Sequence, residues 1–457
     1  MESLSTSQAL LQSLERRRDH AAVHQEGREY TIGELLDRAG QWAAYLSQAG
    51  VGPGKVCAAV GEFSFNTGAF LLAALRQRCT VVPLRPGAPA EISQLLSIAA
   101  ADVIVELHRE ELNHSAVTVE KRDSPLLRDF LETGQPGIIA FTSGSAGQPK
   151  ALLHDFDRML KNIARFDRKG YRSLIFLLFN HLGGINTLLT VLSSTGGVAV
   201  IPGQRTTEEI AALVERARVE LLPVTPTFLA LMLASRCHER HDMSSLKLIT
   251  YGAEPMPQSL LERVNRLFPQ ARFHQTYGMS EICLLQTRSR SSDSLWVKLG
   301  GDGFETRVVD GLLHIRSEFS MLGYLNADNP FQEDGWLPTG DRVDQDGDWV
   351  RFLGRDSDII NVGGEKVTPL EIESVLLDAD NVVDARVRGE KDAMFGARII
   401  ADVALQTPEE PVELRRRLRQ VCLERLARYK VPVRFNIVQD PLHSGRFKKV
   451  RTPRQST

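Results

Sequence analysis

The sequence lacks the features that mark exported, membrane-spanning, disulfide-bonded and zinc-binding proteins. No stretch of about 18 uncharged apolar residues occurs, and the N-terminus is charged where a signal peptide needs an apolar core, so we expect neither a membrane span nor export. The five cysteines are far apart and form no CxxC pair, which favours reduced thiols in a cytoplasmic protein. These cysteines are Cys57, Cys79, Cys237, Cys283 and Cys422.

The chain also lacks an excess of charge of either sign. Its 55 lysines and arginines stand against 57 aspartates and glutamates, for a formal charge of -2, so it has no general attraction to nucleic acid or to anionic lipid. The basic stretch HSGRFKKVR, residues 443–451, would have to act locally. Hydrophobic residues make up 42% of the chain, as in ordinary globular proteins, and its 457 residues exceed the ~250–300 that one core can serve. At least two domains are predicted.

Helical patterns alternate with short Val/Ile-rich runs up to about residue 290, beginning with a helix that Thr31 is expected to cap. This alternation predicts an α/β fold with a mostly parallel sheet. Residues 295–353 instead show short strands and turns, which indicates a β-rich subdomain. We predict an N-terminal domain of residues 1–353, a hinge at 354–358 and a C-terminal domain of residues 359–457.

The C-terminal domain is expected to begin with a helix after the sequence GGEKV. Thr368 is the predicted N-cap, Pro369 occupies the first turn, and Glu371 stands where a capping-box partner belongs.

A loop rich in glycine and hydroxyl residues, FTSGSAGQPK at 141–150, follows an apolar run and precedes a segment with a helical pattern. Glycines allow turns that expose backbone N–H groups, hydroxyls can bond phosphate oxygens, and Lys150 adds positive charge. The loop is not the usual P-loop, because Gln148 and Pro149 separate the second glycine from the lysine. A plain connector is the alternative interpretation, and the rest of the sequence has to decide.

Four further stretches follow in order. They are YGAEPMP (251–257), HQTYGMSE (274–281), GWLPTGDRV (335–343) and GRDSDIINVGGEKVTPLEIE (354–373). With the loop, and over nearly the whole chain, they resemble the acyl-adenylate-forming enzymes: acyl-CoA synthetases, aryl-acid ligases and the adenylation domains of peptide synthetases. The resemblance implies that a carboxylic acid attacks ATP, with Mg²⁺ as cofactor, to give acyl-AMP and pyrophosphate. A thiol of coenzyme A or of a carrier-protein phosphopantetheine then displaces AMP.

The resemblance assigns a set of residues to the nucleotide. Tyr277 matches the residue that stacks on adenine, and the turn from Gly252 through Ala253 to Glu254 lines the same base. In the phosphate loop, Ala146 stands where the family usually has a threonine, so one hydroxyl contact is missing. The remaining matches are Thr142, Ser143, Gly144, Ser145, Gly147, Lys150, Gly278 and Ser280.

Three charged residues complete the nucleotide assignment. Glu281 matches the acid that binds magnesium, Asp341 the carboxylate that takes the ribose hydroxyls, and Arg355 the arginine that assists it. A capped loop would be the ordinary interpretation of the first, and a structural salt bridge that of the other two. Because all three occur in register with the other motifs, the functional interpretation is favoured.

The segment LFNHLGGINTLL, residues 178–189, resembles the family segment beside the acyl group. His181, Gly183 and Gly184 would contact the acid there, and a satisfied core histidine is the alternative for His181. Peptide-synthetase domains usually place an aspartate in this segment to hold an ammonium group. Asn180 and His181 stand here instead, which favours an aryl or aliphatic acid without an α-amino group.

The resemblance also implies that the last domain swings between two arrangements, one for each step. Ser357 falls at the hinge position, and Gly363, Gly364 and Glu365 match the loop that lines the pantetheine tunnel during thiol transfer. A tight hairpin turn is the structural alternative for these three residues.

The family's last motif carries a lysine that meets the acid and the α-phosphate, but Arg446 occupies the expected position. Either Arg446 replaces the lysine, or a shortened loop brings Lys448 or Lys449 into the site, and Lys448 is our first choice. Guanidinium and ammonium groups are not interchangeable, so the choice matters chemically. A nucleic-acid-binding tail is disfavoured, because no aromatic platform accompanies the basic residues.

The sequence therefore predicts a cytoplasmic acid-thiol ligase whose partners are a small carboxylic acid and coenzyme A or an acyl carrier protein, with no nucleic acid. The alternative is a nucleotide-binding or acyl-adenylate-binding protein that adenylates weakly or not at all, as the substitutions at Arg446 and Ala146 would allow.

Overall fold

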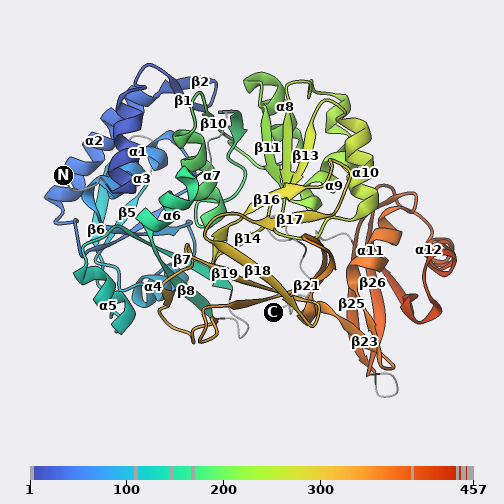
Figure 1. The fold of residues 1–457 in the computed structure, drawn as a ribbon. Coiled ribbons are helices and arrows are strands. Elements are labelled where there is room, and N and C mark those ends of the chain that lie inside the picture. Colours follow the sequence, from blue (N-terminus) through green and yellow to red (C-terminus); the bar gives the residue numbers. More distant parts are fainter. Residues whose placement is uncertain are drawn as a thin grey trace.

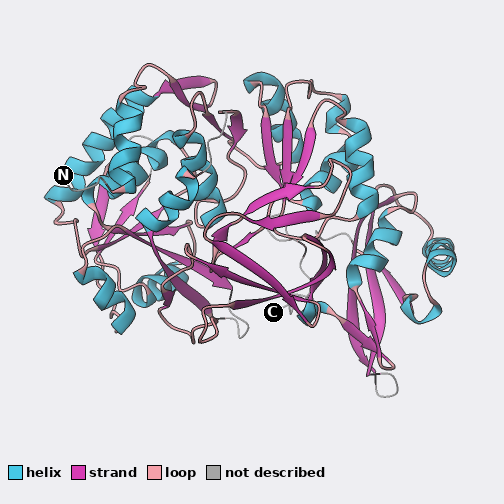
Figure 2. Cartoon of the chain, in the orientation of Figure 1, coloured by secondary structure: helices cyan, strands magenta, loops and turns pink. Residues whose placement is uncertain are grey.

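The computed structural model describes residues 5–107, 112–143, 148–165, 170–392 and 396–438, together with residues 442, 443 and 449. Helices alternate with strands through most of these ranges, so the predicted α/β class is confirmed (Figures 1 and 2). The α-helices are α1 Thr6–Glu15, α2 Ile32–Gln48, α3 Phe65–Gln77, α4 Pro89–Ile98, α5 Pro125–Glu132, α6 Phe156–Ala164, α7 Leu182–Ser193, α8 Thr207–Ala217, α9 Pro226–Ser235, α10 Gln258–Leu267, α11 Pro369–Leu377 and α12 Pro411–Arg425. Short 3-10 turns are η1 Cys237–Glu239, η2 Asp356–Asp358 and η3 Arg428–Lys430.

Two seven-stranded sheets form the α/β part, rather than the one sheet expected. The first has the order β20-β8-β7-β4-β3-β5-β6, with parallel pairing among β7, β4, β3 and β5 and antiparallel pairing at β8, β20 and β6. Its strands are β3 Val56–Val60, β4 Thr80–Leu84, β5 Val103–Glu106, β6 Asn113–Ala116, β7 Gly137–Ser143, β8 Pro149–Asp155 and β20 Gly323–Tyr324.

The second sheet has the order β13-β12-β11-β9-β10-β1-β2 and is parallel except at β2. Its strands are β1 Ala21–Gln25, β2 Arg28–Thr31, β9 Arg172–Leu174, β10 Val198–Ile201, β11 Leu221–Val224, β12 Leu248–Tyr251 and β13 Arg272–Gln275.

A six-stranded antiparallel sheet confirms the predicted β-rich region. Its strands are β16 Gln286–Ser289, β17 Val297–Gly300, β18 Phe304–Val309, β19 Leu312–Ser317, β21 Leu337–Asp346 and β22 Trp349–Arg355. A small hairpin of β14 Gly278–Met279 and β15 Cys283–Leu284 precedes it. Strand β20 leaves this region to pair with β8, so the β-rich region is tied to the first sheet.

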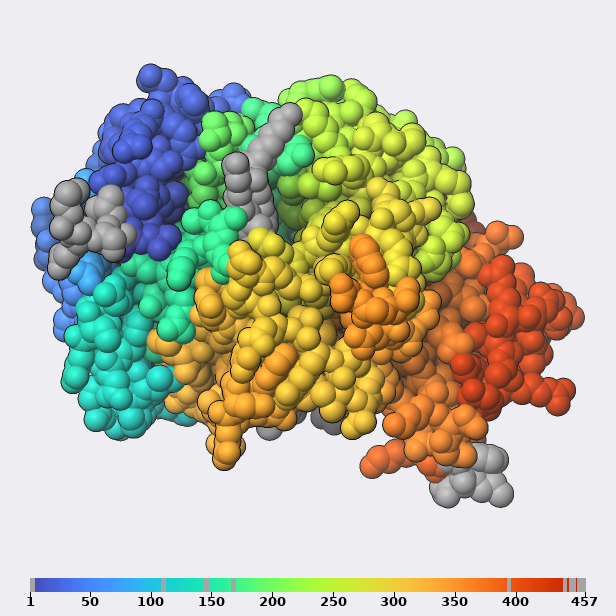
Figure 3. Space-filling view, viewed as in Figure 1, coloured from blue at the N-terminus to red at the C-terminus, as the bar shows by residue number. Residues whose placement is uncertain are grey.

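Residues after 359 form a lobe at one side of the molecule, orange to red in Figure 3. It contains a three-stranded sheet of β25 Val382–Asp392, β26 Gly396–Leu405 and β27 Arg434–Ile437, and a hairpin of β23 Ile360–Val362 and β24 Glu365–Val367. Its buried apolar side chains, from Ile360 to Phe435, form a cluster of their own. Helix α9 packs on β25 and α10 on α11 across the interface.

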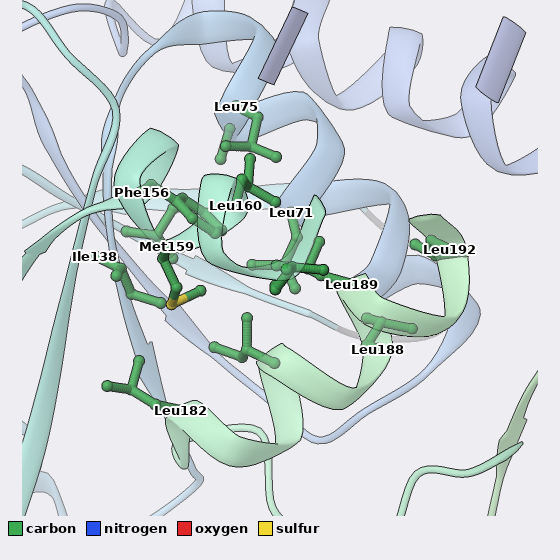
Figure 4. Close-up of a cluster of buried hydrophobic side chains, with 14 of the residues drawn as sticks. Leu71, Leu75, Ile138, Phe156, Met159, Leu160, Leu182, Leu188, Leu189 and Leu192 are labelled. Atoms are coloured by element: carbon green, nitrogen blue, oxygen red, sulfur yellow. The ribbon is translucent and has the colours of Figure 1, made fainter. Parts of the chain in front are cut away.

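The core beneath the candidate phosphate loop joins three helices to one strand (Figure 4). Ile138 of β7 is fully buried where α3, α6 and α7 meet. The side chains that surround it are Leu71, Leu75, Phe156, Met159, Leu160, Leu182, Leu188, Leu189 and Leu192. Packing of this kind holds β7 in a defined position.

The segment after the phosphate loop corrects the sequence prediction. Residues 151–155 were expected to begin a helix, but they belong to β8, Pro149–Asp155, and the helix α6 begins only at Phe156. Ala151, Leu152 and Leu153 are all fully buried, because β8 lies between β7 and β20. A strand covered on both faces needs no polar alternation, so its apolar run could not be distinguished from a helix.

Among the described helices, none is long and apolar enough to cross a bilayer. All five cysteines are free and buried, as predicted.

The two predicted caps differ. Thr31 makes a complete capping box, with its Oγ1 accepting from the Glu34 N–H at 3.1 Å and the Glu34 carboxylate accepting from the Thr31 N–H at 2.7 Å. Thr368 is the N-cap of α11 and Pro369 opens the helix, but the Thr368 side chain makes no capping hydrogen bond. The Glu371 carboxylate instead binds Lys430 at 2.7 Å. The predicted capping box between Thr368 and Glu371 is therefore wrong.

Thr31→Ala is expected to lower the free energy of unfolding by about 0.5–2 kcal/mol, because the Glu34 N–H loses its acceptor. Thr368→Ala is the matched control, since it removes an N-cap threonine without a side-chain bond. Thermal unfolding of both variants tests this, and equal losses would contradict the assignment.

Candidate nucleotide and acid site

Strands β7 and β8 pair antiparallel on either side of the phosphate loop, with Thr142 opposite Lys150 and Ser143 opposite Pro149. Residues Gly144, Ser145, Ala146 and Gly147 lie outside the described residues, as does the Ser143 side chain. The loop is thus flanked by two antiparallel strands, rather than by the predicted strand and helix.

The Asn326 side chain holds the start of β8, next to the loop. No sequence motif pointed to this residue. Its Oδ1 accepts from the Ala151 N–H at 2.9 Å, and its Nδ2 donates to the Pro149 carbonyl at 2.9 Å. These bonds fix the backbone on both sides of Lys150. The Lys150 Nζ lies 5.2 Å from the centre of the Tyr324 ring, within reach of a cation–π contact.

Glu281, the expected magnesium ligand, meets the same tyrosine. The Tyr324 hydroxyl donates to Glu281 Oε1 at 2.6 Å, and the Glu281 carbonyl accepts from the Met321 N–H at 2.8 Å. Burial, with the bond to Glu281 added, raises the pKa of Tyr324, so the phenol keeps its proton and can donate. Tyr324 thus joins Lys150 to Glu281, although no sequence motif pointed to it.

The single carboxylate of Glu281 is enough for a magnesium ion that binds together with ATP. No group of three or more metal-binding side chains is found among the described residues. Magnesium in phosphate-transfer sites is commonly held by one or two carboxylates together with substrate phosphates and water. Glu281 can therefore hold Mg²⁺ with ATP.

Tyr277, Asp341 and Arg355 lie together in the structure. The Tyr277 hydroxyl donates to Asp341 Oδ2 at 2.6 Å, and Arg355 Nε lies 2.8 Å from Asp341 Oδ1. The two charged residues face each other because β21 pairs with β22 in that register. Burial above all, and then the Asp341 charge, raises the pKa of Tyr277 well above its usual value.

Phe352 is a further residue that the motifs did not reveal. Its ring stacks on Tyr277 with centroids 4.6 Å apart and an angle of 15° between planes. One face of Tyr277 is therefore occupied, and a base that stacks on Tyr277 must use the other face. Phe352 lies on β22, opposite Val343 of β21. Its contact with Tyr277 depends on the folded sheet and could not be found from a motif.

His154 connects β8 to the segment that carries Tyr277 and Glu281. Its Nε2 lies 2.6 Å from the Ser280 carbonyl, so Nε2 carries the proton, and its Nδ1 lies 3.9 Å from Cys283 Sγ. Burial lowers the pKa of His154 to about 4. Burial likewise raises the pKa of Cys283 to about 12, so the thiol stays protonated and can donate to Nδ1. Both side chains act as neutral structural groups.

The turn at residues 252–254 packs tightly against Thr276, which directly follows β13. A Cβ on Gly252 would stand 2.7 Å from the Thr276 carbonyl, which only glycine allows. Ala253 has a φ of +69°, a region that costs energy for an L-residue and is common at functional sites. The Glu254 Oε1 accepts from the Thr227 N–H at 2.7 Å, which ties the turn to the start of α9.

Gly278 begins the β14–β15 hairpin, where a Cβ would stand 2.7 Å from the Cys283 carbonyl. Close backbone approach therefore accounts for this glycine.

At the acid end, His181 caps α7, and its Nδ1 accepts from the Gly183 N–H at 3.0 Å. Gly184 packs on the preceding backbone, since a Cβ there would stand 2.7 Å from the Leu178 carbonyl. The structure thus gives His181 and both glycines a structural role in starting α7. The Asn180 Oδ1 is buried, and no hydrogen-bond partner for it is found among the described residues.

The hinge and tunnel residues lie in an exposed part of the C-terminal lobe. Ser357 is in η2, and Gly363 and Gly364 form the β23–β24 turn with φ values of +61° and +93°. These residues and Glu365 are all exposed. The hairpin alternative is correct as a description of the local structure.

Of the three candidate cations, Arg446 and Lys448 lie outside the described residues. The Lys449 ammonium is held within the C-terminal lobe, where it donates to the Ala385 carbonyl at 2.6 Å and lies 3.2 Å from Asp384 Oδ1.

Two family models match this chain. Residues 10–325 match the family described as AMP-binding enzyme, and residues 371–448 match the AMP-binding enzyme C-terminal domain. A 2-succinylbenzoate-CoA ligase of Bacillus licheniformis is 31% identical over 327 residues, 66% of this chain and 66% of the relative. An indoleacetate-CoA ligase of Aromatoleum aromaticum is 29% identical over 326 residues, 65% of this chain and 62% of the relative. The matches span just under two thirds of both relatives.

A solved structure of an anthranilate CoA ligase in complex with anthranoyl-AMP shares the fold. Its TM-score is 0.83 at 21% sequence identity, covering 98% of this chain and 95% of that one.

Acidification is expected to destabilise the protein through His154. Its folded-state pKa of about 4 lies below the usual value, so the unfolded chain binds more protons between those values. The free energy of unfolding should fall as the pH drops from ~6.5 towards 4, by at most ~1.4 kcal/mol per pH unit from this group.

His154→Gln keeps a donor for the Ser280 carbonyl but does not titrate, so its stability should fall less steeply. Urea midpoints at pH 7.5 and 5.0 measure the difference. The exposed His20→Gln is the control, and equal slopes for all three proteins would contradict the role of His154.

Proposed function

The chain belongs to the AMP-binding enzyme family, and from this premise we propose that it is an ATP-dependent ligase that joins a carboxylic acid to a thiol. It first converts the acid to acyl-AMP, and then passes the acyl group to the pantetheine thiol of coenzyme A or of a carrier protein. The observation that carries this proposal is that Lys150 and Glu281 both contact Tyr324. Glu281 also lies shortly after Tyr277 in the sequence, and the Tyr277 hydroxyl donates to Asp341.

The first step brings anions together. A carboxylate oxygen of the acid attacks the α-phosphorus of ATP, the bond from that phosphorus to the bridging oxygen breaks, and pyrophosphate leaves. Positive charge and fixed donors must offset the repulsion, as in other phosphoryl chemistry. Lys150 and the backbone of the 142–150 loop supply them in this chain, and Mg²⁺ held by Glu281 would neutralise phosphate charge.

Asp341 is suited to the ribose. Its carboxylate already accepts from Tyr277 and pairs with Arg355, and ionised acceptors bind hydroxyl groups strongly. The arginine orients the Asp341 carboxylate. Gly252 and Ala253 would pass close to the base, and the free face of Tyr277 would stack on it.

In the second step the thiol sulfur attacks the acyl carbonyl carbon, the thiol proton is lost, and the bond to the AMP oxygen breaks. We assign the domains as 1–353 and 359–457, with the hinge at 354–358 around Ser357. Gly363, Gly364 and Glu365 would line the thiol's path after the C-terminal domain turns. Their exposure here is consistent with a surface that is used in another arrangement.

The proposed acid lacks an α-amino group. Asn180 is neutral and cannot offset an ammonium charge, and the relatives named above act on aryl acids. The buried Asn180 Oδ1 is an acceptor that a hydroxyl or amino substituent of the acid would satisfy. A cytoplasmic location agrees with the five free thiols.

A binding protein that adenylates slowly is the second candidate. It is favoured by the commitment of the Lys449 ammonium to the C-terminal lobe and by Arg446 at the usual lysine position.

Purified protein is expected to catalyse acid-dependent exchange of pyrophosphate into ATP with at least one aryl or aliphatic acid, and not with α-amino acids. The measurement uses a panel of aryl, short-chain and long-chain acids, with amino acids as controls. Demonstrated ATP binding without exchange for any acid would favour the second candidate.

Asn180→Leu keeps side-chain volume and removes the acceptor. It is expected to lower kcat/KM about tenfold or more for an aryl acid with a ring hydroxyl or amino group, and to change it little for the unsubstituted acid. Steady-state pyrophosphate release with such a matched pair tests this. Equal losses for both acids would exclude a donor-specific contact.

A further inference from the structure

Lys449 makes contacts with both domains through different atoms. Its side chain is 12% exposed and lies among residues of the C-terminal lobe, whereas its backbone N–H donates to Glu254 Oε2 of the N-terminal domain at 3.0 Å. Lys449 also pairs with His443 in an antiparallel bridge, so the chain on either side of residues 444–448 is tied together. One residue thus links the C-terminal lobe to the turn beside the proposed adenine site.

Two buried carboxylates surround the Lys449 ammonium. Asp384 Oδ1 lies 3.2 Å away and Glu373 Oε2 lies 3.7 Å away, with side-chain exposures of 9% and 1%. Both carboxylates also accept backbone N–H groups, from Ala385 and Val387 at 2.8 Å each. Withdrawing the ammonium would remove a positive charge that lies beside two buried carboxylates, which is strongly unfavourable. The ammonium is therefore a fixed part of the C-terminal lobe and moves with it.

The Glu254 contact has a different character, because it crosses the domain interface. The other carboxylate oxygen of Glu254, Oε1, accepts from the Thr227 N–H at the start of α9, so the carboxylate is anchored in the N-terminal domain. A cleft of about 320 Å³ also lies where α9 and α10 face the C-terminal lobe, lined partly by Leu233, Leu260 and Leu377. Glu254 and Lys449 are not among the residues that line it.

We propose that Lys449 is a positioning residue rather than the catalytic cation, and that its bond to Glu254 docks the C-terminal domain in the arrangement used for acyl-adenylate formation. This rests on the proposed function. The bond occurs here together with an exposed 363–365 turn, which is the segment proposed for the thiol step. Turning the lobe to bring that segment to the site would break the Glu254 bond and leave the ammonium contacts intact.

Glu254→Gln separates docking from adenine binding. The amide oxygen can still accept from Thr227, and the amide nitrogen then faces the Lys449 N–H, where it cannot accept. Pyrophosphate release with acid and ATP should slow about tenfold, while thioester formation from supplied acyl-AMP and coenzyme A should change less than about twofold. Damage to the adenine site would slow both steps, because acyl-AMP carries the same base.

Glu262→Gln, at an exposed position on α10, is the matched control and should leave both steps unchanged. Equal slowing of both half-reactions by Glu254→Gln, or no slowing of either, would overturn the proposal.

Hydrogen exchange gives a readout that does not need activity. The Lys449 amide should exchange faster in Glu254→Gln than in the unsubstituted protein, with the Thr227 amide unchanged as an internal control. Unchanged exchange at Lys449 would overturn the proposal even if the protein adenylated no acid. Absence of pyrophosphate release from the unsubstituted protein would instead count against the proposed function.

Lys449→Arg and Lys449→Met test the side chain. Arginine should retain pyrophosphate release better than methionine, and methionine should lower the unfolding temperature of the protein. A methionine variant with normal stability and no pyrophosphate release would identify Lys449 as the catalytic cation and overturn the proposal.

Discussion

A neutral histidine between two chain segments is the contact on which the candidate site depends. His154 ends the buried part of β8 and holds the Ser280 carbonyl, although the two residues are 126 positions apart. Strand β8, which carries His154, also carries Lys150. The segment around Ser280 carries Tyr277 and Glu281. Because the imidazole is fully buried and uncharged at neutral pH, the bond adds no net charge where phosphate anions would lie.

Tyrosine hydroxyls then set the spacing of the acidic groups. Tyr324 donates to Glu281 and Tyr277 donates to Asp341, each at 2.6 Å. In both cases burial raises the tyrosine pKa, which keeps the phenol a donor and the carboxylate an acceptor. Two carboxylates are thus held ready for cations and hydroxyl groups. Phe352 and Asn326 support these groups from behind, one by stacking and the other by fixing the hairpin backbone.

The C-terminal lobe is held differently from the N-terminal core. It has its own apolar cluster, and helices α9 and α10 of the N-terminal domain pack against it. Lys449 illustrates the division, with an ammonium that belongs to the lobe and an N–H that reaches the other domain. A lobe attached in this way can turn while its own structure stays intact.

The sequence by itself determined the family, the α/β class, the Thr31 N-cap and the free cysteines, because these depend on local patterns or on ordered motifs. It selected Tyr277, Asp341 and Arg355 as nucleotide-binding candidates, and the β21–β22 register places Asp341 opposite Arg355. Only the tertiary structure decided that residues 149–155 form a strand, since an apolar run covered on both faces has no distinguishing period. It alone revealed His154, Tyr324, Asn326 and Phe352, whose partners lie far away in the chain. Only the tertiary structure revealed the ion pairs of the Lys449 ammonium with Asp384 and Glu373. The partner of a basic residue depends on which carboxylates the fold buries near it.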